Sequence, residues 1–360
     1  MKKSFIFAAC AIAAMASCTK NEVFVSEQND AQITFTSPVV KPNTKTPVAG
    51  EQHVYSTNEH FKVYASWTNE DYAAGDWGQK LYMDNVEVAY SAVINGWEPG
   101  DAYYWPKTGK LTFAAYSPAE VAGTVAYDAE GLTVTGFQVE DDTAKQYDFM
   151  YAERSYNRTE SKNLSQAGDG HTSQSYNGVD LMFHHALSSI VFKVKADGNI
   201  TNTAFTIKKL EILNAQNKGD FAEGIQDGAT YTSTPEWTNT TGKTDYTVWE
   251  GTEKLTAGAD YKELDKVNDA ILLPQSFTNG EDHVKVHIDY SIQRTGGPEI
   301  EQEATFDLTN NYKDTANNDV TAWEIGKRYT YNILFSLNKI YFAPEVTDWV
   351  DVNMNPFEVE

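Results

Sequence analysis

The sequence predicts an all-β protein made of antiparallel β-sandwiches, and three observations favour this class. Apolar and polar residues alternate with period two through many short segments, which is typical of strands with one buried and one wet face. Helical periodicity over three turns is hard to find. Clusters of Asn, Asp, Gly, Ser and Thr separate the alternating segments, and these residues favour turns. Short strands between such turns are typical of sandwiches.

The alternation predicts strands along most of the chain after Gln32. The clearest segments are residues 32–36, 61–67, 111–115, 132–134, 190–195, 284–290 and 329–337. A sandwich domain typically needs about 100 to 150 residues, so the length predicts two domains. The best boundary follows the polar stretch at 157–180, where a new apolar strand begins at Leu181. The predicted domains are therefore residues 32–180 and 181–360.

The first residues predict export. Lys2 and Lys3 precede twelve uninterrupted apolar residues, 5–16, a run too short to span a bilayer but suited to a secretory signal. The run ends at Ser17 and Cys18, and this junction resembles the lipobox of bacterial lipoproteins. That resemblance implies a signal peptide at residues 1–17, acylation of Cys18 with palmitate and a lipidated tether at 18–31. The alternative is an ordinary signal peptide with an incidental cysteine.

Charge and cysteine content exclude several classes. The net charge at pH 7 is −23, and such a surface repels nucleic acid and anionic lipid. Of the two cysteines, Cys10 leaves with the signal, so the mature chain has neither a disulfide nor a thiol for catalysis. No nucleotide-binding glycine loop, nucleophile elbow or EF-hand pattern is found. We expect no cofactor and no enzymatic activity.

Several phrases together resemble the fimbrillin family, the lipoprotein precursors of type V pili and their accessory subunits. They are residues 146–152 (QYDFMYA), 183–190 (FHHALSSI), 271–275 (ILLPQ), 326–333 (GKRYTYNI) and 346–349 (VTDW). The resemblance implies two tandem transthyretin-like antiparallel β-sandwich domains and delivery to the cell outer membrane. In stalk-forming members, a trypsin-like protease removes the lipidated segment with its first strand. The groove left behind accepts a strand from another pilus subunit.

The chain offers candidate parts for this assembly. Residues 32–36 form a short first strand, and a loop containing Lys45 follows it. Stalk subunits of the family are commonly cut after arginine, but no arginine precedes Arg154. Lys45 is therefore the candidate processing site, and the alternative is a chain that stays lipidated as an anchor or accessory subunit. The alternating residues at 350–359 are either a donor strand or the last strand of their own domain.

Histidines and carboxylates give no predicted metal or catalytic site. His283 and His287 are four residues apart in an alternating strand, about 13 Å in extended backbone and too far for one ion. His184 and His185 are adjacent and should point to opposite faces. With 51 acidic residues, chance carboxylate pairs are expected, so the glycosidase interpretation is the weaker one.

The sequence also contains candidate sites for O-glycosylation and for contacts with sugars. Thr143 and Thr315 each lie in an Asp-Thr-Ala sequence that resembles an O-glycosylation site of bacteria that carry fimbrillins. Four aromatic residues, Trp97, Tyr103, Tyr104 and Trp105, cluster near a turn and either cover a sandwich edge or form a platform for sugars. The sequence thus predicts a surface fimbrial subunit or anchor that mediates adhesion. The alternative is a glycan-binding surface lipoprotein of a polysaccharide-uptake system, with an outer-membrane hydrolase as a third, weaker reading.

Overall fold

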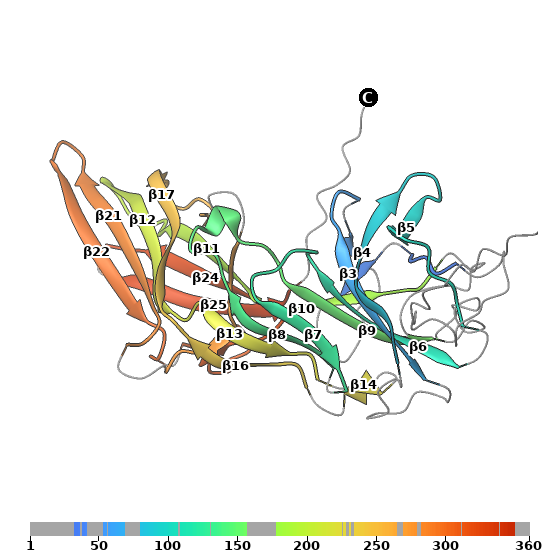
Figure 1. The fold of residues 1–360 in the computed structure, drawn as a ribbon. Helices are drawn as coiled ribbons and strands as arrows, with labels where there is room; N and C mark the ends of the chain where they lie inside the picture. Colours follow the sequence, from blue (N-terminus) through green and yellow to red (C-terminus); the bar gives the residue numbers. More distant parts are fainter. Residues whose placement is uncertain are drawn as a thin grey trace, which may run out of the picture.

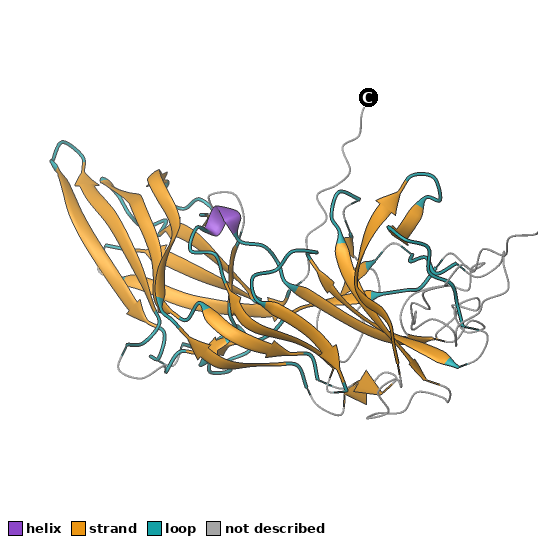
Figure 2. Cartoon of the chain, in the orientation of Figure 1, coloured by secondary structure: helices purple, strands orange, loops and turns teal. Residues whose placement is uncertain are grey.

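The computed structural model is almost entirely strand and loop (Figure 2), so the predicted all-β class is confirmed. Within the described part of the chain, the helical content is one 3-10 turn, η1 (Thr143–Lys145). The same part contains no helix with the length and apolar character needed to cross a membrane. The structure describes residues 32–36, 38–41, 53–55, 57–68, 80–106, 109–129, 131–156, 178–224, 226–227, 230–231, 234–264, 269–278, 282–310, 312–337 and 339–349.

The strands follow one another along the whole described chain (Figure 1). Up to the predicted boundary they are β1 (Val39–Lys41), β2 (His53–Val54), β3 (Phe61–Thr68), β4 (Lys80–Ser91), β5 (Gly96–Pro99), β6 (Lys110–Ser117), β7 (Thr124–Asp128), β8 (Gly131–Gln138) and β9 (Met150–Tyr156). Beyond it they are β10 (Met182–His185), β11 (Ser188–Ala196), β12 (Thr203–Ala215), β13 (Lys218–Ala222), β14 (Gln226–Asp227), β15 (Thr230–Tyr231), β16 (Glu236–Thr241), β17 (Thr244–Leu255), β18 (Lys262–Glu263), β19 (Ala270–Leu272), β20 (Gln275–Ser276), β21 (Lys285–Arg294), β22 (Glu299–Asp307), β23 (Ala322–Trp323), β24 (Lys327–Phe335) and β25 (Ile340–Asp348).

The largest sheet has eight strands in the order β2-β1-β10-β9-β6-β3-β4-β5. Its central strands β3 and β6 are buried on both faces. Phe61, Val63 and Phe113 face one core, while Tyr64 and Tyr116 face another. Burial on both faces explains why these strands are rich in large apolar and aromatic side chains.

A four-stranded sheet, β16-β13-β8-β7, lies between the two ends of the molecule in Figure 1. In it, β8 from before the predicted boundary pairs with β13 from after it. Likewise, β10 hydrogen-bonds to β9 and β1 of the eight-stranded sheet. One cluster of buried residues runs from Tyr64 to Trp349. Backbone pairing and apolar packing therefore both connect residues before and after the predicted domain boundary at residue 180. The division into two domains stays a prediction.

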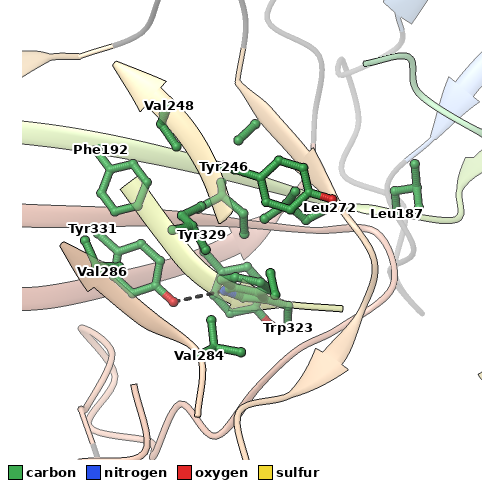
Figure 3. Packing of buried hydrophobic residues seen from close by; sticks show 14 of the residues in the cluster. Leu187, Phe192, Tyr246, Val248, Leu272, Val284, Val286, Trp323, Tyr329 and Tyr331 are labelled. Carbon is green, nitrogen blue, oxygen red and sulfur yellow. Dashed lines mark hydrogen bonds between the residues drawn. The ribbon is translucent and has the colours of Figure 1, made fainter. Parts of the chain in front are cut away.

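Besides the two-stranded sheets β14-β15 and β20-β23, the described chain forms two larger sheets that enclose a second part of the core. Their strand orders are β18-β11-β24-β25 and β17-β12-β21-β22, and β19 also pairs with β11. Figure 3 shows Phe192, Tyr331 and Trp323 among the buried side chains. The Phe192 and Tyr331 rings stack with centroids 5.4 Å apart. The Trp323 indole N–H donates to the Tyr331 hydroxyl at 3.0 Å, which satisfies both buried polar groups.

Among the strands that the structure describes, two pairs are parallel, although most are antiparallel as the alternation predicts. β11 pairs with β24 in parallel over eight residues from Ser189 to Ala196, and β1 pairs in parallel with β10. Parallel neighbours need a long connection between them. More than a hundred residues separate the members of each pair, so the chain meets this requirement.

Candidate functional site: the N-terminal segment in the first sheet

Residues 32–36, here called the N-terminal segment, are hydrogen-bonded to backbone on both of their edges. On one edge the Ile33 N–H donates to the Tyr103 carbonyl at 2.7 Å. Phe35 exchanges two bonds with Trp97 of β5, at 2.8 and 3.1 Å. The segment therefore continues the sheet beyond β5, the last strand of the eight-stranded order.

The opposite edge of the N-terminal segment pairs with the chain that leads into β10. The Thr36 N–H donates to the Val179 carbonyl at 2.9 Å, and the Val179 N–H donates to the Thr34 carbonyl at 2.6 Å. Val179 lies parallel to Phe35. The segment thus occupies a slot between β5 and residues 178–180, with no free backbone edge.

The side chains of the N-terminal segment alternate as the sequence predicts. Ile33 and Phe35 are 0% exposed, whereas Thr34 between them is only half-buried. The Phe35 ring meets the rings of Phe61 and Phe113 edge-on, each with a centroid distance of 5.7 Å. Burying a side chain of this size contributes roughly 1.5–3 kcal/mol, so the segment is a structural part of this core.

Gly178 brings the two backbones close together. Its φ of +128° lies in a region that suits glycine, and an added Cβ would lie 2.6 Å from the Phe35 carbonyl carbon. Only a residue without a side chain fits there. The sequence places this glycine at the end of a polar stretch, and nothing in that stretch indicates its partner.

The chain continues from the N-terminal segment into β1, which lies between β2 and β10. Val40 of β1 is buried in the same core as Phe35. The candidate processing site, Lys45, lies outside the described residues, as do Cys18, the predicted signal peptide and the tether. Cleavage after Lys45 would separate both the N-terminal segment and β1 from the rest of the chain.

The aromatic cluster around Trp97 and Trp105 forms part of the slot that holds the N-terminal segment. Trp97 and Trp105 are buried, and the Trp97 and Tyr103 carbonyls accept the bonds from the N-terminal segment. Of the predicted cluster, Tyr104 is the exposed member, at 40%. The two tryptophans therefore build the core and present no sugar platform, which agrees with the edge-covering interpretation.

Trp349, the last residue that the structure describes, is held by contacts with the rest of the fold. The Trp349 ring stacks on His185 with centroids 4.0 Å apart and nearly parallel planes. His185 Nδ1 lies 2.6 Å from a carboxylate oxygen of Asp148, and the Trp349 N–H donates to the Gly326 carbonyl at 2.9 Å. His184 and His185 differ in burial, as their adjacency predicts. The candidate donor strand at 350–359 lies outside the described residues.

The two predicted O-glycosylation threonines lie in different environments. Thr143 is buried in η1, and its hydroxyl is 3.5 Å from the Thr247 carbonyl. Thr315 is exposed in a turn. Hydrogen bonds from the Asn318 side chain and backbone N–H hold the pKa of the neighbouring Asp314 below its ordinary value. Of the two threonines, Thr315 is the one whose side chain is accessible to solvent.

Comparisons with known proteins identify a family and similar solved structures. A family model described as fimbrillin-like matches residues 44–349. A crystal structure of a fimbrial protein from Bacteroides vulgatus ATCC 8482 is 17% identical, covers 89% of this chain and 100% of its own, and superposes with a TM-score of 0.55. A fimbrilin from Porphyromonas gingivalis W83 is 11% identical, with 90% and 99% coverage and a TM-score of 0.42. No curated protein matches the chain.

Proposed function

The chain belongs to the fimbrillin-like family, and from this premise we propose that it is a cell-surface fimbrial subunit, or an anchor or accessory protein of a fimbrium, that mediates adhesion. Its role in this proposal is structural rather than catalytic. Its partners are other pilus subunits, which it joins by strand donation. The observation that carries the proposal is the N-terminal segment, a short strand inserted between two others and followed by the candidate cleavage site Lys45.

The physical argument concerns the slot that the N-terminal segment would leave. Without residues 32–36, the backbone groups of Trp97, Tyr103 and Val179 would lose their hydrogen bonds. The rings of Phe61 and Phe113 would lose their contact with Phe35. Unpaired backbone and an open apolar groove are both costly in water. A strand from a neighbouring subunit with alternating apolar residues restores both interactions. Such head-to-tail contacts propagate as a fibre.

Cleavage of the folded chain tests strand donation directly. A site-specific protease sequence at Lys45 allows the chain to fold first and be cut afterwards. We expect cut chains to form ladders of oligomers, and uncut chains to stay monomeric. A peptide of residues 30–41 should suppress the ladders by refilling the slot. The same peptide with Phe35→Asp should not, because a charge does not fit among the Phe61 and Phe113 rings. Cut chains that remain monomeric after the segment is released would refute strand donation.

We further propose that the chain is an outer-membrane lipoprotein acylated on Cys18. The supporting observation is the apolar run at 5–16, which ends in small residues before that cysteine. Cys18→Ala should abolish labelling by a fatty-acid probe and release the protein from the membrane fraction. Labelling that persists in this variant would refute acylation at Cys18.

The N-terminus of surface material distinguishes the stalk role from the anchor role. A stalk subunit should begin near Thr46, because cleavage at Lys45 removes the N-terminal segment. An anchor or accessory subunit should keep the acylated Cys18. Sequencing of protein sheared from the cell surface gives one result or the other, while the membrane-bound fraction serves as the comparison.

A further inference from the structure

The β21–β22 hairpin brings three metal-ligating side chains together on its outer face. Along β21, Val286 and Ile288 point into the core while His287 and Asp289 lie on the other face. Glu303 of β22 is the direct cross-strand partner of Asp289. One ligand atom from each of His287, Asp289 and Glu303 lies within 4.8 Å of the other two. The hairpin, not the sequence spacing, creates this arrangement.

The His287 ring is held in an orientation suited to metal binding. Its Nδ1 lies 2.9 Å from the Thr305 hydroxyl, and its Nε2 lies 3.2 Å from Asp289 Oδ1. When Nδ1–H donates to Thr305, the Nε2 lone pair faces a carboxylate oxygen. In the other tautomer, Nε2–H donates to Asp289 and the Thr305 hydroxyl donates to Nδ1, and a bound cation would replace the Nε2 proton. Metal-binding histidines commonly fix the ring through a hydrogen bond from the other nitrogen.

Two carboxylates in this group attract a cation, and the charge of Lys209 on a neighbouring strand opposes it at Asp289. Lys209 of β12 is the cross-strand neighbour of Asp289, but its Nζ lies 2.6 Å from Glu211. Lys209 donates a hydrogen bond to Glu211. Among the described residues, Glu303 has no hydrogen bond or ion pair of its own. Asp289 and Glu303 thus share one group of ligand atoms with His287.

We propose that His287, Asp289 and Glu303 bind a divalent transition-metal cation of the Zn²⁺ class. One imidazole nitrogen and two carboxylate oxygens suit Zn²⁺ better than Ca²⁺ or Mg²⁺, which prefer oxygen ligands alone. Three protein ligands leave a coordination position for water or for a group from another molecule. Bound metal would link β22, the edge strand of its sheet, to β21 and so stabilise the hairpin.

Calorimetric titration with Zn²⁺ tests the site on a tag-free chain that starts at Thr19. This chain contains neither Cys10 nor Cys18 and keeps every residue that the structure describes. We expect saturable binding that His287→Ala and Glu303→Gln each weaken at least about tenfold. Thr305→Val keeps all three ligands and should weaken binding by about tenfold, because the ring loses its orienting partner.

His283→Ala is the matched control. His283 also pairs with a carboxylate, at 3.1 Å from Asp307, but it belongs to no group of three ligands among the described residues. Its loss should leave Zn²⁺ affinity unchanged. Circular dichroism of each variant checks that the exposed substitutions leave the fold intact. The proposal is overturned if Zn²⁺ does not saturate, if His287→Ala binds as tightly as the parent chain, or if Ca²⁺ competes equally. None of these measurements depends on polymerisation, so the metal site and strand donation fail or succeed separately.

Discussion

At the scale of single residues, Phe35 anchors the N-terminal segment through its ring contacts and its backbone bonds to Trp97. Alternation in residues 32–36 predicts which side chains are buried, because Ile33 and Phe35 are the apolar ones. It does not predict what buries them. Phe61 and Phe113 lie on strands well apart from each other in sequence, and their meeting at Phe35 depends on the sheet order.

Removing the Phe35 ring should destabilise the fold strongly. Phe35→Ala leaves a cavity beside the rings of Phe61 and Phe113, and we expect a loss of about 3–5 kcal/mol in the free energy of unfolding. Thr34→Ala changes a half-buried side chain in the same strand and should cost less than about 1 kcal/mol. Chemical denaturation of both variants provides the measurement. Equal effects would mean that the segment does not contribute to the core.

The close approach at Gly178 gives a second prediction, with a glycine control. Gly178→Ala and Gly136→Ala both place a side chain at positive φ, +128° and +70° respectively. The added methyl group collides with Phe35 at Gly178 but meets nothing within 4 Å at Gly136. We expect Gly178→Ala to cost at least about 2 kcal/mol more than Gly136→Ala. Similar unfolding midpoints for the two variants would show that the backbones can separate freely.

At the scale of elements, identical short sequences behave differently because their elements differ. Asp-Thr-Ala occurs in η1, where Thr143 packs against β17, and in the turn around Thr315, which faces solvent. The three-residue pattern alone cannot separate the two cases. Burial depends on what the rest of the chain places over each threonine.

If the chain is O-glycosylated, Thr315 should carry the glycan. A glycan on Thr143 would have to be attached before η1 packs, since the Thr143 hydroxyl is enclosed beside the Thr247 carbonyl. Mass spectrometry of the surface protein should find the modification on the peptide that contains Thr315. Thr315→Ala should remove it, and Thr143→Ala should not. A glycopeptide that contains Thr143 alone would contradict this expectation.

At the scale of the whole molecule, buried tyrosines tie stability to pH. Burial raises the pKa of many tyrosines above the ordinary value of 10.0, and the rise is largest for Tyr55, Tyr116, Tyr246, Tyr329 and Tyr331. The folded chain holds their protonated form, whereas the unfolded chain releases the proton near the ordinary pKa. Their contribution is therefore fully present below about pH 10 and is lost as the pH rises further.

The expected result is a free energy of unfolding that falls steeply above about pH 10. Denaturant titrations at increasing pH measure it, and tyrosinate absorbance reports the ionisation. Tyr246→Phe should flatten the slope, because it removes one raised pKa and breaks no hydrogen bond seen in the described part of the chain. A free energy that stays constant into this alkaline range would show that these phenols ionise without unfolding.

The alternation by itself determined the all-β class and the burial pattern of residues 32–36, since period two directly separates a wet face from a dry one. The ordered phrases between residues 146 and 349 indicated the family. Only the tertiary structure decided the neighbours: the slot around Phe35, the pairing of β8 with β13 across the predicted boundary, and the approach of Glu303 to His287. Strand order and register depend on contacts between residues far apart in the chain. The spacing of apolar residues within one segment does not predict those contacts.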